Sequence, residues 1–335
     1  MKAIVLNAFG AVTNFSMAEL PLPVPGAAEV LIELKASAFN PIDYQMRKGL
    51  RESKLMRSPV LGRECSGIVV QTGAEVEGFF PGDDVIVMSG SRGSNGSYAT
   101  FMTLDYHFIA RKPKNISFEM AAAIPASGTT AWQAFTRMAC HRESRIFING
   151  AAGGVGRFLI SLLLAHGFER IVASAGSEES QAALKRIGLP AAQIVDYKDP
   201  GFEKLILTAN DDQYFDYSVD LVGGRQSEIA ADVLKVNGIY VDITFLATAA
   251  ARATLFDKGC VVLNISGYAY AMENKVSWYG NTLARICNLI EEDRILAPEI
   301  NILGGLNVET VQMAHRLMEA NQLYGKKLIM RIERI

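Results

Sequence analysis

The sequence predicts an α/β fold with two domains, in which a domain built on a doubly wound parallel sheet interrupts a β-rich one. Three observations support this prediction. Short β-branched runs separated by Pro and Gly fill residues 1–120, strands alternate with helices further along, and one terminal strand is too isolated to form a sheet alone. We therefore assign 1–122 and 268–335 to the β-rich domain and 123–267 to the parallel-sheet domain.

In the β-rich part, strands are predicted wherever apolar and β-branched residues run together. The chain begins with such a run, Met1–Leu6, and clusters such as Pro21–Gly26 and Phe80–Asp83 provide turns between the runs. The other strands predicted there are Val30–Lys35, Ser66–Gln71, Asp84–Met88 and Tyr98–Thr103.

From Ala121 the pattern becomes helical, with Ala121–Ala123 and Thr129–Cys140, and then strands and helices alternate. Such alternation indicates right-handed crossovers and a parallel sheet. The strands are predicted at Arg145–Asn149, Arg170–Ala175, Gln193–Val195, Tyr217–Val222 and Gly238–Ile243, and the helices at Val155–His166, Ser180–Ile187, Glu203–Leu207 and Ser227–Leu234.

Two helices and a strand follow. Thr282–Glu292 carries Leu283 and Ile286 at helical spacing, and Val308–Ala320 is a second helix. The final strand, Lys327–Ile332, has no neighbouring strand in the sequence. It is therefore expected to return to the first sheet, which makes the parallel-sheet domain an insertion.

Composition and charge exclude several classes of protein. The chain has 335 residues, with 33 Lys and Arg against 35 Asp and Glu, so its net charge of −2 lacks the basic excess that nucleic-acid or membrane-surface binding needs. No apolar run reaches the ~20 residues of a membrane span. The chain start lacks a signal-peptide pattern, so we expect a cytoplasmic protein. The chain has four cysteines, and they are far apart: Cys65, Cys140, Cys260 and Cys287. This number and spacing exclude a disulfide scaffold and a Cys-x-x-Cys site.

The most informative segment is the turn Gly150–Gly156, because it follows a predicted strand and opens a predicted helix. That context separates a dinucleotide fingerprint from a chance cluster of glycines. The G-x-G-x-x-G spacing falls on Ala151, Gly153 and Gly156, with Ala in place of the first glycine. Gly153 would let the backbone approach a pyrophosphate, and Gly156 would let the helix pack closely on its strand. A dinucleotide site is therefore predicted, and the alternative is a purely structural turn.

The tip of the next strand distinguishes NADPH from NADH. An NAD site usually has Asp or Glu there, about 20 residues after the glycines, to hold the ribose 2′-hydroxyl. Here the tip is Ala173-Ser174-Ala175-Gly176-Ser177, and Ser177 could donate to a 2′-phosphate. NADPH is therefore favoured over NADH. Glu178 and Glu179, which begin the next helix, would count against NADPH if they turned toward the site.

Seven segments, taken in order, carry a resemblance to a known family: Asn40–Asp43, Leu61–Gly67, Gly82–Val85, Gly128–Ala131, Gly150–Gly156, Asp220–Gly223 and Gly325–Lys326. The chain resembles, nearly end to end, the zinc-independent quinone oxidoreductase (zeta-crystallin-like) branch of the medium-chain dehydrogenase/reductase superfamily. The resemblance implies a GroES-like β-rich domain at both chain ends, a Rossmann domain inserted in it, and a nicotinamide held between the two.

The resemblance also implies which residues bind the cofactor. Asn40 and Thr129 would lie by the nicotinamide ribose and amide, and Ser177 and Tyr197 near the adenosine 2′-phosphate. One departure counts against a strict preference for NADPH, because Ser180 stands where NADPH-binding relatives often have Lys. The pyrophosphate and the cofactor face would be lined by Gly153, Gly154, Val155, Leu221, Val222, Ile243 and Thr244.

The same resemblance to the family disfavours a zinc site in this chain. Zinc-dependent relatives take a histidine ligand from a Gly-His-Glu segment where this chain has Arg63, and a cysteine where it has Asn40–Asp43. Without a Lewis acid, alcohol oxidation is disfavoured, whereas hydride transfer to an activated acceptor needs no metal. We expect no metal cofactor. None of the four histidines is spaced with Cys or a carboxylate as a ligand set: His107, His141, His166 and His315.

The predicted activity is NADPH-dependent hydride transfer to a small quinone or another activated α,β-unsaturated carbonyl. After the hydride arrives, an enone needs a proton at its α-carbon, whereas a reduced quinone takes protons from solvent. Tyr44, next to Asn40–Asp43, is the candidate proton donor. The alternative for Tyr44 is an aromatic ring that only packs at the domain edge.

Two other functions and one assembly state stay open. The first is an enoyl-thioester reductase, which acts on a CoA-linked or carrier-bound chain and would need a cluster of basic residues at its entrance. The alternative for such a basic cluster is a solvated loop face. The second is an NADPH-binding structural or redox-sensing protein with little turnover. A homodimer is expected from the family, through the nearly uncharged edge segment Val261–Ile265. The candidate basic entrance is the run Arg47, Lys48, Arg51, Lys54 and Arg57.

Overall fold

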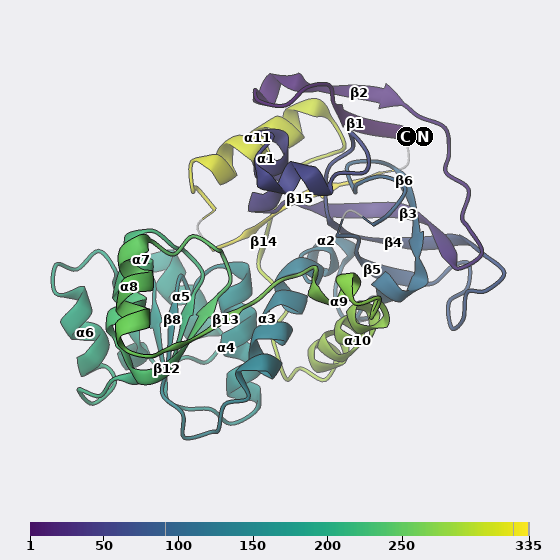
Figure 1. Ribbon diagram of the computed structural model, residues 1–335. Helices are drawn as coiled ribbons and strands as arrows, with labels where there is room; N and C mark the ends of the chain where they lie inside the picture. Colours follow the sequence, from purple (N-terminus) through teal and green to yellow (C-terminus); the bar gives the residue numbers. More distant parts are fainter. Residues whose placement is uncertain (91, 324, 334–335) are drawn as a thin grey trace. The chain divides into compact units, whose positions relative to one another are not determined.

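The computed structural model describes residues 1–90, 92–323 and 325–333. The chain forms two compact units (Figure 1): the first comprises 1–129, 268–293 and 297–335, and the second 130–267 and 294–296. The junction between them falls within helix α3 (Pro125–Met138), whereas the sequence placed it at residue 122. Within the described ranges, no helix is long and apolar enough to cross a membrane.

The first unit contains a sheet whose described strands run in the order β14-β15-β3-β4-β5-β7, with β6 also paired to β3. A separate antiparallel pair is formed by β1 (Lys2–Leu6) and β2 (Phe15–Glu19). The strands of the sheet are β3 (Glu29–Ala38), β4 (Glu64–Thr72), β5 (Asp84–Met88), β6 (Phe101–Asp105), β7 (Ile109–Arg111), β14 (Ile300–Gly304) and β15 (Lys327–Arg331).

The terminal strand joins this sheet as the sequence predicted. β15 pairs antiparallel with β3, with Ile329 opposite Ala38. Figure 1 shows the yellow β15 beside the purple β3. Segments from both ends of the described chain therefore build one sheet.

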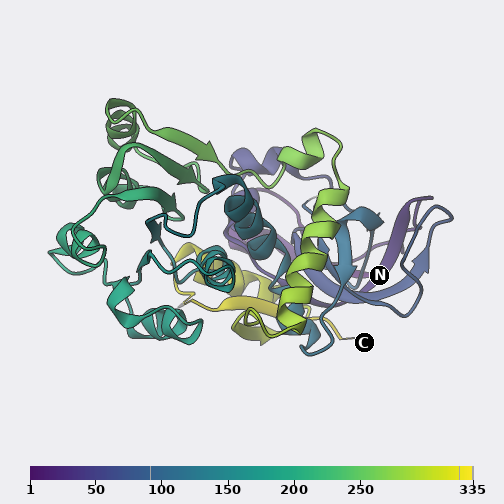
Figure 2. The ribbon, with the colours of Figure 1, turned by 90° about the horizontal axis from the view of Figure 1, so that it is seen from below.

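Helices pack against the sheet of the first unit. α10 (Ser277–Glu291) buries Leu283 and Ile286, as its helical spacing indicates, and packs along β7. Figure 2 shows this helix in light green beside the blue strands. The other helices are α1 (Pro41–Arg47), α2 (Phe118–Ala122), α9 (Ala269–Met272) and α11 (Val308–Glu319), with the 3₁₀ turns η1 (Val12–Asn14), η2 (Arg51–Leu55) and η3 (Tyr106–Phe108).

The second unit contains a parallel sheet whose described strands run in the order β10-β9-β8-β11-β12-β13. The winding direction reverses between β8 and β11, and ligands of such sheets bind beside the carboxyl ends of the strands at that switch. This is the predicted Rossmann architecture. The strands are β8 (Ile146–Asn149), β9 (Ile171–Ser174), β10 (Ile194–Val195), β11 (Phe215–Asp220), β12 (Leu234–Asp242) and β13 (Val261–Asn264).

The helices of the second unit cover an apolar core. The rings of Phe147 and Phe215, both fully buried, lie 5.6 Å apart in that core. The helices are α4 (Gly154–Ala165), α5 (Glu178–Arg186), α6 (Phe202–Thr208), α7 (Arg225–Asp232) and α8 (Ala249–Asp257), with the 3₁₀ turn η4 (Ala191–Gln193).

Candidate functional site

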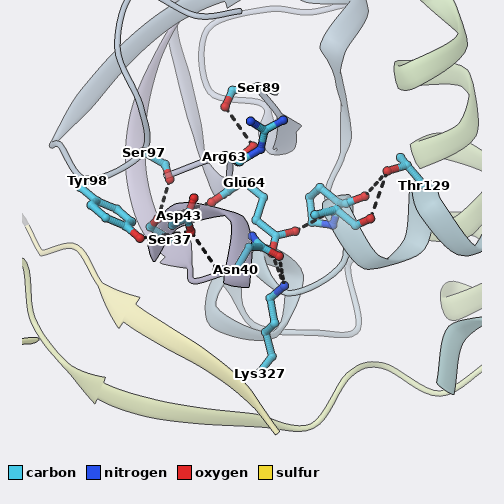
Figure 3. A network of polar contacts seen from close by, with 12 residues as sticks. Ser37, Asn40, Asp43, Arg63, Glu64, Ser89, Ser97, Tyr98, Thr129 and Lys327 are labelled. Carbon is cyan, nitrogen blue, oxygen red and sulfur yellow. Dashed lines mark hydrogen bonds and ion pairs between the residues drawn. The ribbon is translucent and has the colours of Figure 1, made fainter. Parts of the chain in front are cut away.

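Three polar side chains, Asn40, Glu64 and Lys327, bind one another in the first unit (Figure 3). Glu64 Oε1 accepts hydrogen bonds from Lys327 Nζ at 2.6 Å and from Asn40 Nδ2 at 2.9 Å. Lys327 Nζ also donates to Asn40 Oδ1 at 2.6 Å. Glu64 is fully buried, and the Lys327 side chain is 11% exposed. Both ends of the Asn40 amide are therefore held by a buried ion pair.

The pairing of the sheet explains why these residues meet. Glu64 is the first residue of β4 and lies opposite Ala38 of β3. Lys327 is the first residue of β15, which pairs with β3 on its other side, and Asn40 follows directly after β3. The start of β4, the start of β15 and the end of β3 thus lie at the same end of these neighbouring strands, although they are far apart in the sequence.

Glu64 also connects Asn40 to the start of α3. Its second carboxylate oxygen accepts a hydrogen bond from the backbone N–H of Ala126 at 2.6 Å. One turn later, Thr129 donates its hydroxyl to the Pro125 carbonyl at 2.6 Å. Asn40 and Thr129, both predicted to lie by the nicotinamide, are therefore linked through Glu64 within the first unit. Their contact with a cofactor stays a prediction.

A buried titratable cluster adjoins Asn40. Asp43 Oδ2 accepts from the Asn40 backbone N–H at 2.8 Å and from the Tyr98 hydroxyl at 3.2 Å, and that hydroxyl lies 3.3 Å from His315 Nε2. Burial raises the pKa of Asp43 from 3.8 to about 6, although the Asn40 hydrogen bond and the charge of Arg63 oppose the rise. Burial lowers the pKa of His315 from 6.5 to about 3, so this histidine is neutral at pH 7.

Tyr44 follows Asp43 on α1 and is half-buried. The Lys48 ammonium lies 5.4 Å from the centroid of the Tyr44 ring. Tyr44 therefore belongs to the helix that begins at the Asn40 group, and its role as proton donor stays a prediction.

The basic run at residues 47–57 is not a uniform cationic face. The Arg47 side chain is only 2% exposed, donates to the Gly10 carbonyl and forms an ion pair with Glu319. Lys48 pairs with the same carboxylate at 3.0 Å. Two of the five cations are thus already paired with one acid, which weakens the case for an entrance that binds a phosphopantetheine chain.

In the second unit the glycine turn joins β8 to α4. Gly150 has φ +72°, a backbone conformation that favours glycine, and a Cβ on Gly156 would lie 2.4 Å from the Ala151 carbonyl oxygen. At Gly153, the N-cap of α4, a Cβ would meet only the Gly150 carbonyl oxygen, at 3.5 Å. Because the first N–H groups of a helix lack acceptors within it, this exposed end of α4 fits an anionic group such as a pyrophosphate.

The other residues predicted to line the cofactor face follow strands β11 and β12. Val222 donates its backbone N–H to Asp220 Oδ1 at 3.0 Å, and a Cβ on Gly150 would lie 2.5 Å from the Val222 side chain. The turn after β8 is therefore packed against the end of β11. The carboxyl ends of these neighbouring strands bring together Gly153, Gly154, Val155, Leu221, Val222, Ile243 and Thr244.

Ser177 and Tyr197 also lie together, but Ser177 is the N-cap of α5. Its Oγ accepts a hydrogen bond from the Ser180 N–H at 3.2 Å. The Ser177 hydroxyl donates to Ser180 Oγ at 3.1 Å, and the pKa of the exposed Glu179 carboxyl is held below its usual value first by its own backbone N–H and then by Ser177. A Cβ on Gly176 would lie 2.4 Å from the Tyr197 ring. One of the two glutamates thus contacts Ser177, which counts against NADPH.

Sequence reasoning missed Glu64 and Lys327 as members of the site. Each is a charged residue that opens a strand with a buried middle part, and buried charges are nearly always paired. That signal indicates that each needs a partner. It does not identify the partner, because their proximity depends on the pairing of both strands with β3.

The residues at the positions expected for zinc do not fit a zinc ion. By the family resemblance, the segment Asn40–Asp43 and Arg63 stand where zinc-dependent relatives have ligands, and Glu64 is already paired with the Lys327 ammonium. Zinc needs neutral or anionic N, S or O ligands, and it would be repelled by these two cations. Nowhere in the described part of the chain do three His, Cys, Asp or Glu side chains form a group that could hold a metal.

Comparison with known proteins assigns both units. The alcohol dehydrogenase GroES-like domain family matches residues 26–114, and the zinc-binding dehydrogenase family matches residues 154–284. NAD(P)H oxidoreductase RTN4IP1, mitochondrial, of Dictyostelium discoideum is 28% identical, over 98% of this chain and 99% of that protein. Reticulon-4-interacting protein 1, mitochondrial, of Caenorhabditis elegans is 34% identical, over 69% of this chain and 67% of that protein. The chain belongs to the medium-chain dehydrogenase/reductase superfamily.

Within this superfamily the chain lies in the quinone oxidoreductase and RTN4IP1-like branch, and it is an NAD(P)H oxidoreductase of that type. The structure of the quinone oxidoreductase from Coxiella burnetii superimposes with a TM-score of 0.82 at 25% identity, over 99% of each chain. Both sequence relatives described above are named as mitochondrial proteins. The cytoplasmic location expected from the sequence stays a prediction.

Proposed function

We propose that this medium-chain dehydrogenase/reductase transfers a hydride from NADPH, in preference to NADH, to a quinone or another activated α,β-unsaturated carbonyl without zinc. The observation that carries the proposal is the Asn40–Glu64–Lys327 group, in which a buried ion pair holds one amide. The name of the Coxiella relative supports a quinone as acceptor. We place the activity in the cytoplasm, which fractionation of the source cells tests.

The residues of the chain would bind and orient the reactants. When bound, NADPH supplies the hydride from its reduced nicotinamide. Because Glu64 and Lys327 hold both ends of the Asn40 amide, Asn40 can meet the nicotinamide ribose without losing rotational freedom. Thr129 would act beside it, and the N-terminus of α4 would attract the pyrophosphate. Ser177, Tyr197 and the carboxyl ends of β11 and β12 would hold the rest of the cofactor.

Two acceptors test the reaction class. With NADPH as donor, we expect 1,4-naphthoquinone to be reduced with a kcat/KM at least about tenfold above that of crotonyl-CoA, a difference of about 1.4 kcal/mol in transition-state binding. The reverse order would support the enoyl-thioester reductase. Tight NADPH binding without oxidation by either acceptor would contradict the proposed reaction.

Tyr44 is the proposed proton donor for enones. Replacing Tyr44 by Phe removes the hydroxyl and keeps the ring, so enone reduction should slow by about 10²–10⁴-fold. Quinone reduction should keep its rate, because solvent protonates the reduced quinone. Steady-state rates with both acceptors measure the difference. Equal effects on the two would remove Tyr44 from the mechanism.

Glu179 tests the cofactor preference. Its carboxylate lies at Ser177, the proposed partner of the 2′-phosphate, so its charge should repel that phosphate. In Glu179→Gln the ratio of kcat/KM for NADPH to that for NADH should rise about fivefold, because the neutral side chain no longer repels the phosphate. Glu178→Gln, at the preceding exposed position, is the matched control and should leave the ratio unchanged. A wild-type enzyme that prefers NADH would refute NADPH as the proposed donor.

A further inference from the structure

A row of buried polar side chains crosses the parallel sheet of the second unit at the carboxyl ends of its strands. Asp220, the last residue of β11, lies opposite Asn149 of β8 on one side and opposite Asp242 of β12 on the other. Ser174, the last residue of β9, donates its hydroxyl to Asn149 Oδ1 at 3.0 Å. Residues at one register of neighbouring parallel strands point to the same face, so these four side chains form one layer.

Several hydrogen-bond donors surround the fully buried Asp220 carboxylate. Its Oδ1 accepts from the backbone N–H groups of Val222 at 3.0 Å and Gly223 at 2.9 Å, and from Asn149 Nδ2 at 3.4 Å. Its Oδ2 accepts from the Tyr240 hydroxyl at 2.7 Å. Burial, and next the charge of Asp220, raise the pKa of Tyr240, so this hydroxyl keeps the proton that it donates. Both oxygens of the carboxylate are therefore fixed.

The same row reaches the glycine turn before α4. Asn149 immediately precedes Gly150, and the Gly150 backbone N–H donates to Ser174 Oγ at 3.0 Å. The Asn149 amide thus connects Asp220 to the glycine turn, while the backbone N–H groups of Val222 and Gly223 connect it to the turn after β11. One carboxylate contacts both turns that are predicted to receive the dinucleotide.

A negative charge at this place needs a reason, because the dinucleotide is itself an anion. The glycine turn, which would hold the pyrophosphate, packs against Val222 directly after β11, so the Asp220 charge opposes phosphate binding. Hydrogen bonds to a charged acceptor are about twice as strong as neutral ones, so a carboxylate holds a turn more firmly than an amide would. The firm turn is what offsets the repulsion.

We propose that Asp220 is a positioning residue of the dinucleotide site: its carboxylate holds the turn after β11 and the glycine turn after β8 in the arrangement that receives the cofactor. The inference rests on the proposed function, because it takes NADPH as the ligand of these turns. Asp220 acts through the backbone of Val222 and Gly223 and through the Asn149 amide. Turns that are ordered before binding lose less conformational entropy when the ligand arrives.

Two other roles for Asp220 predict different results. If the carboxylate only stabilises the fold, its loss lowers the melting temperature and leaves the NADPH affinity of the folded protein unchanged. If the nucleotide senses only the charge, Asp220→Ala and Asp220→Asn both remove a repulsion, and both bind NADPH more tightly. If Asp220 positions the turns, Asp220→Ala weakens binding, whereas Asp220→Asn keeps an oxygen that can accept from Val222 and Gly223.

Fluorescence titration of NADPH into the full chain, below the melting temperature of each variant, separates these roles. In Asp220→Ala the Kd should rise at least about tenfold, because buried N–H groups lose their acceptor. In Asp220→Asn it should stay within about threefold of wild type. Asp216→Ala is the matched control on the same strand, since Asp216 accepts from the Arg145 backbone N–H at 2.8 Å and pairs with Lys235 near the amino end of β11. This control should lower the melting temperature and keep the NADPH Kd.

Hydrogen exchange gives a second readout in the protein without nucleotide. In Asp220→Ala the backbone amides of Val222, Gly223 and Gly150 should exchange at least about tenfold faster than in wild type, and in Asp216→Ala they should not. If Asp220→Ala does not fold, Tyr240→Phe decides the question. It removes only the hydroxyl that holds Asp220 Oδ2, and the NADPH Kd should rise at least about threefold.

The outcomes separate this role from the proposed function. NADH is titrated in parallel, so a protein that prefers NADH still tests the role of Asp220. A folded Asp220→Ala variant that binds the nucleotide as well as wild type does, or more tightly, would overturn the positioning role and leave the proposed function standing. An unchanged Kd in Tyr240→Phe, where Asp220→Ala does not fold, would overturn it equally. A wild-type protein that binds neither nucleotide would refute the proposed function, and the positioning role with it.

Discussion

At the scale of single residues, Asp43 and His315 make opposite contributions to the pH dependence of stability. The pKa of Asp43 is raised from 3.8 to about 6, so the folded protein binds more protons than the unfolded chain in that window, and the contribution of Asp43 is lost as pH rises through about 6. The pKa of His315 is lowered from 6.5 to about 3, so its contribution is present above pH 6.5 and is lost as pH falls toward 3. The two contributions oppose each other where the windows overlap.

Substitution of either residue should reveal the contribution of the other. In Asp43→Asn the melting temperature should increase as the pH is raised from 3 to 6.5. In His315→Gln it should decrease as the pH is raised from 3.8 to about 6. Both slopes are compared with that of the wild-type curve. Each group can contribute a slope of up to about 1.4 kcal/mol per pH unit. Thermal unfolding at a series of pH values measures this. Parallel curves for wild type and both variants would contradict it.

Some residues of the candidate site could be predicted from the sequence, and others could not. Asn40 and Thr129 followed from the family resemblance, because their segments are recognisable without knowledge of the sheet. Glu64 and Lys327 did not, because only the pairing of β4 and β15 with β3 brings them together. The role of Ser177 as a helix cap, with Glu179 beside it, depends on rotamers that spacing alone does not specify.

At the scale of elements, the glycine turn before α4 offers a matched pair of substitutions. A Cβ on Gly156 would lie 2.4 Å from the Ala151 carbonyl oxygen, so Gly156→Ala should lower the free energy of unfolding by about 1–3 kcal/mol. A Cβ on Gly153 makes only an ordinary contact, so Gly153→Ala should keep stability within about 0.5 kcal/mol.

Binding should show the complementary pattern. Gly153 caps the helix end proposed to hold the pyrophosphate, so Gly153→Ala should weaken NADPH binding about tenfold, or about 1.4 kcal/mol, while the protein stays folded. Fluorescence titration with NADPH and thermal unfolding provide the two measurements. A stable Gly153→Ala variant that binds NADPH normally would place the pyrophosphate elsewhere.

The alternation of elements in the second unit was predictable, because buried parallel strands are apolar runs and their helices have a clear spacing. Three of the described helices, α1, α8 and α9, were missed for physical reasons, and α9 has only four residues. α8 buries only Ala251 and Leu255, which is too little to produce a helical pattern. α1 has seven residues and begins at Pro41, so it resembles a turn in the sequence.

At the scale of the whole molecule, strand β13 is an edge strand of the parallel sheet among the described residues. It lies at the end of the sheet order, and Val261 and Val262 are 56% and 46% exposed. An edge strand with exposed apolar residues and little charge invites pairing with another chain. We therefore expect a homodimer, as the resemblance to the family implies.

Light scattering should accordingly give twice the chain mass of 36.4 kDa. Val262→Lys places a charge on the edge and should produce monomers, because charged edge residues oppose strand pairing. Val236→Lys, at an exposed valine of β12, is the matched control and should stay dimeric. A wild-type particle with the mass of one chain would refute the dimer.

The late position of Lys327 has a consequence for how the protein is made. A ribosome releases the chain from its N-terminus, and domains generally fold as units as they emerge. Residues 130–267 can fold before β15 has been synthesised, but the partner of the buried Glu64 arrives only with that last strand. A message cut short just before Lys327 would therefore yield a nucleotide-binding unit joined to a first unit with an uncompensated buried carboxylate, a product that quality-control proteases would recognise.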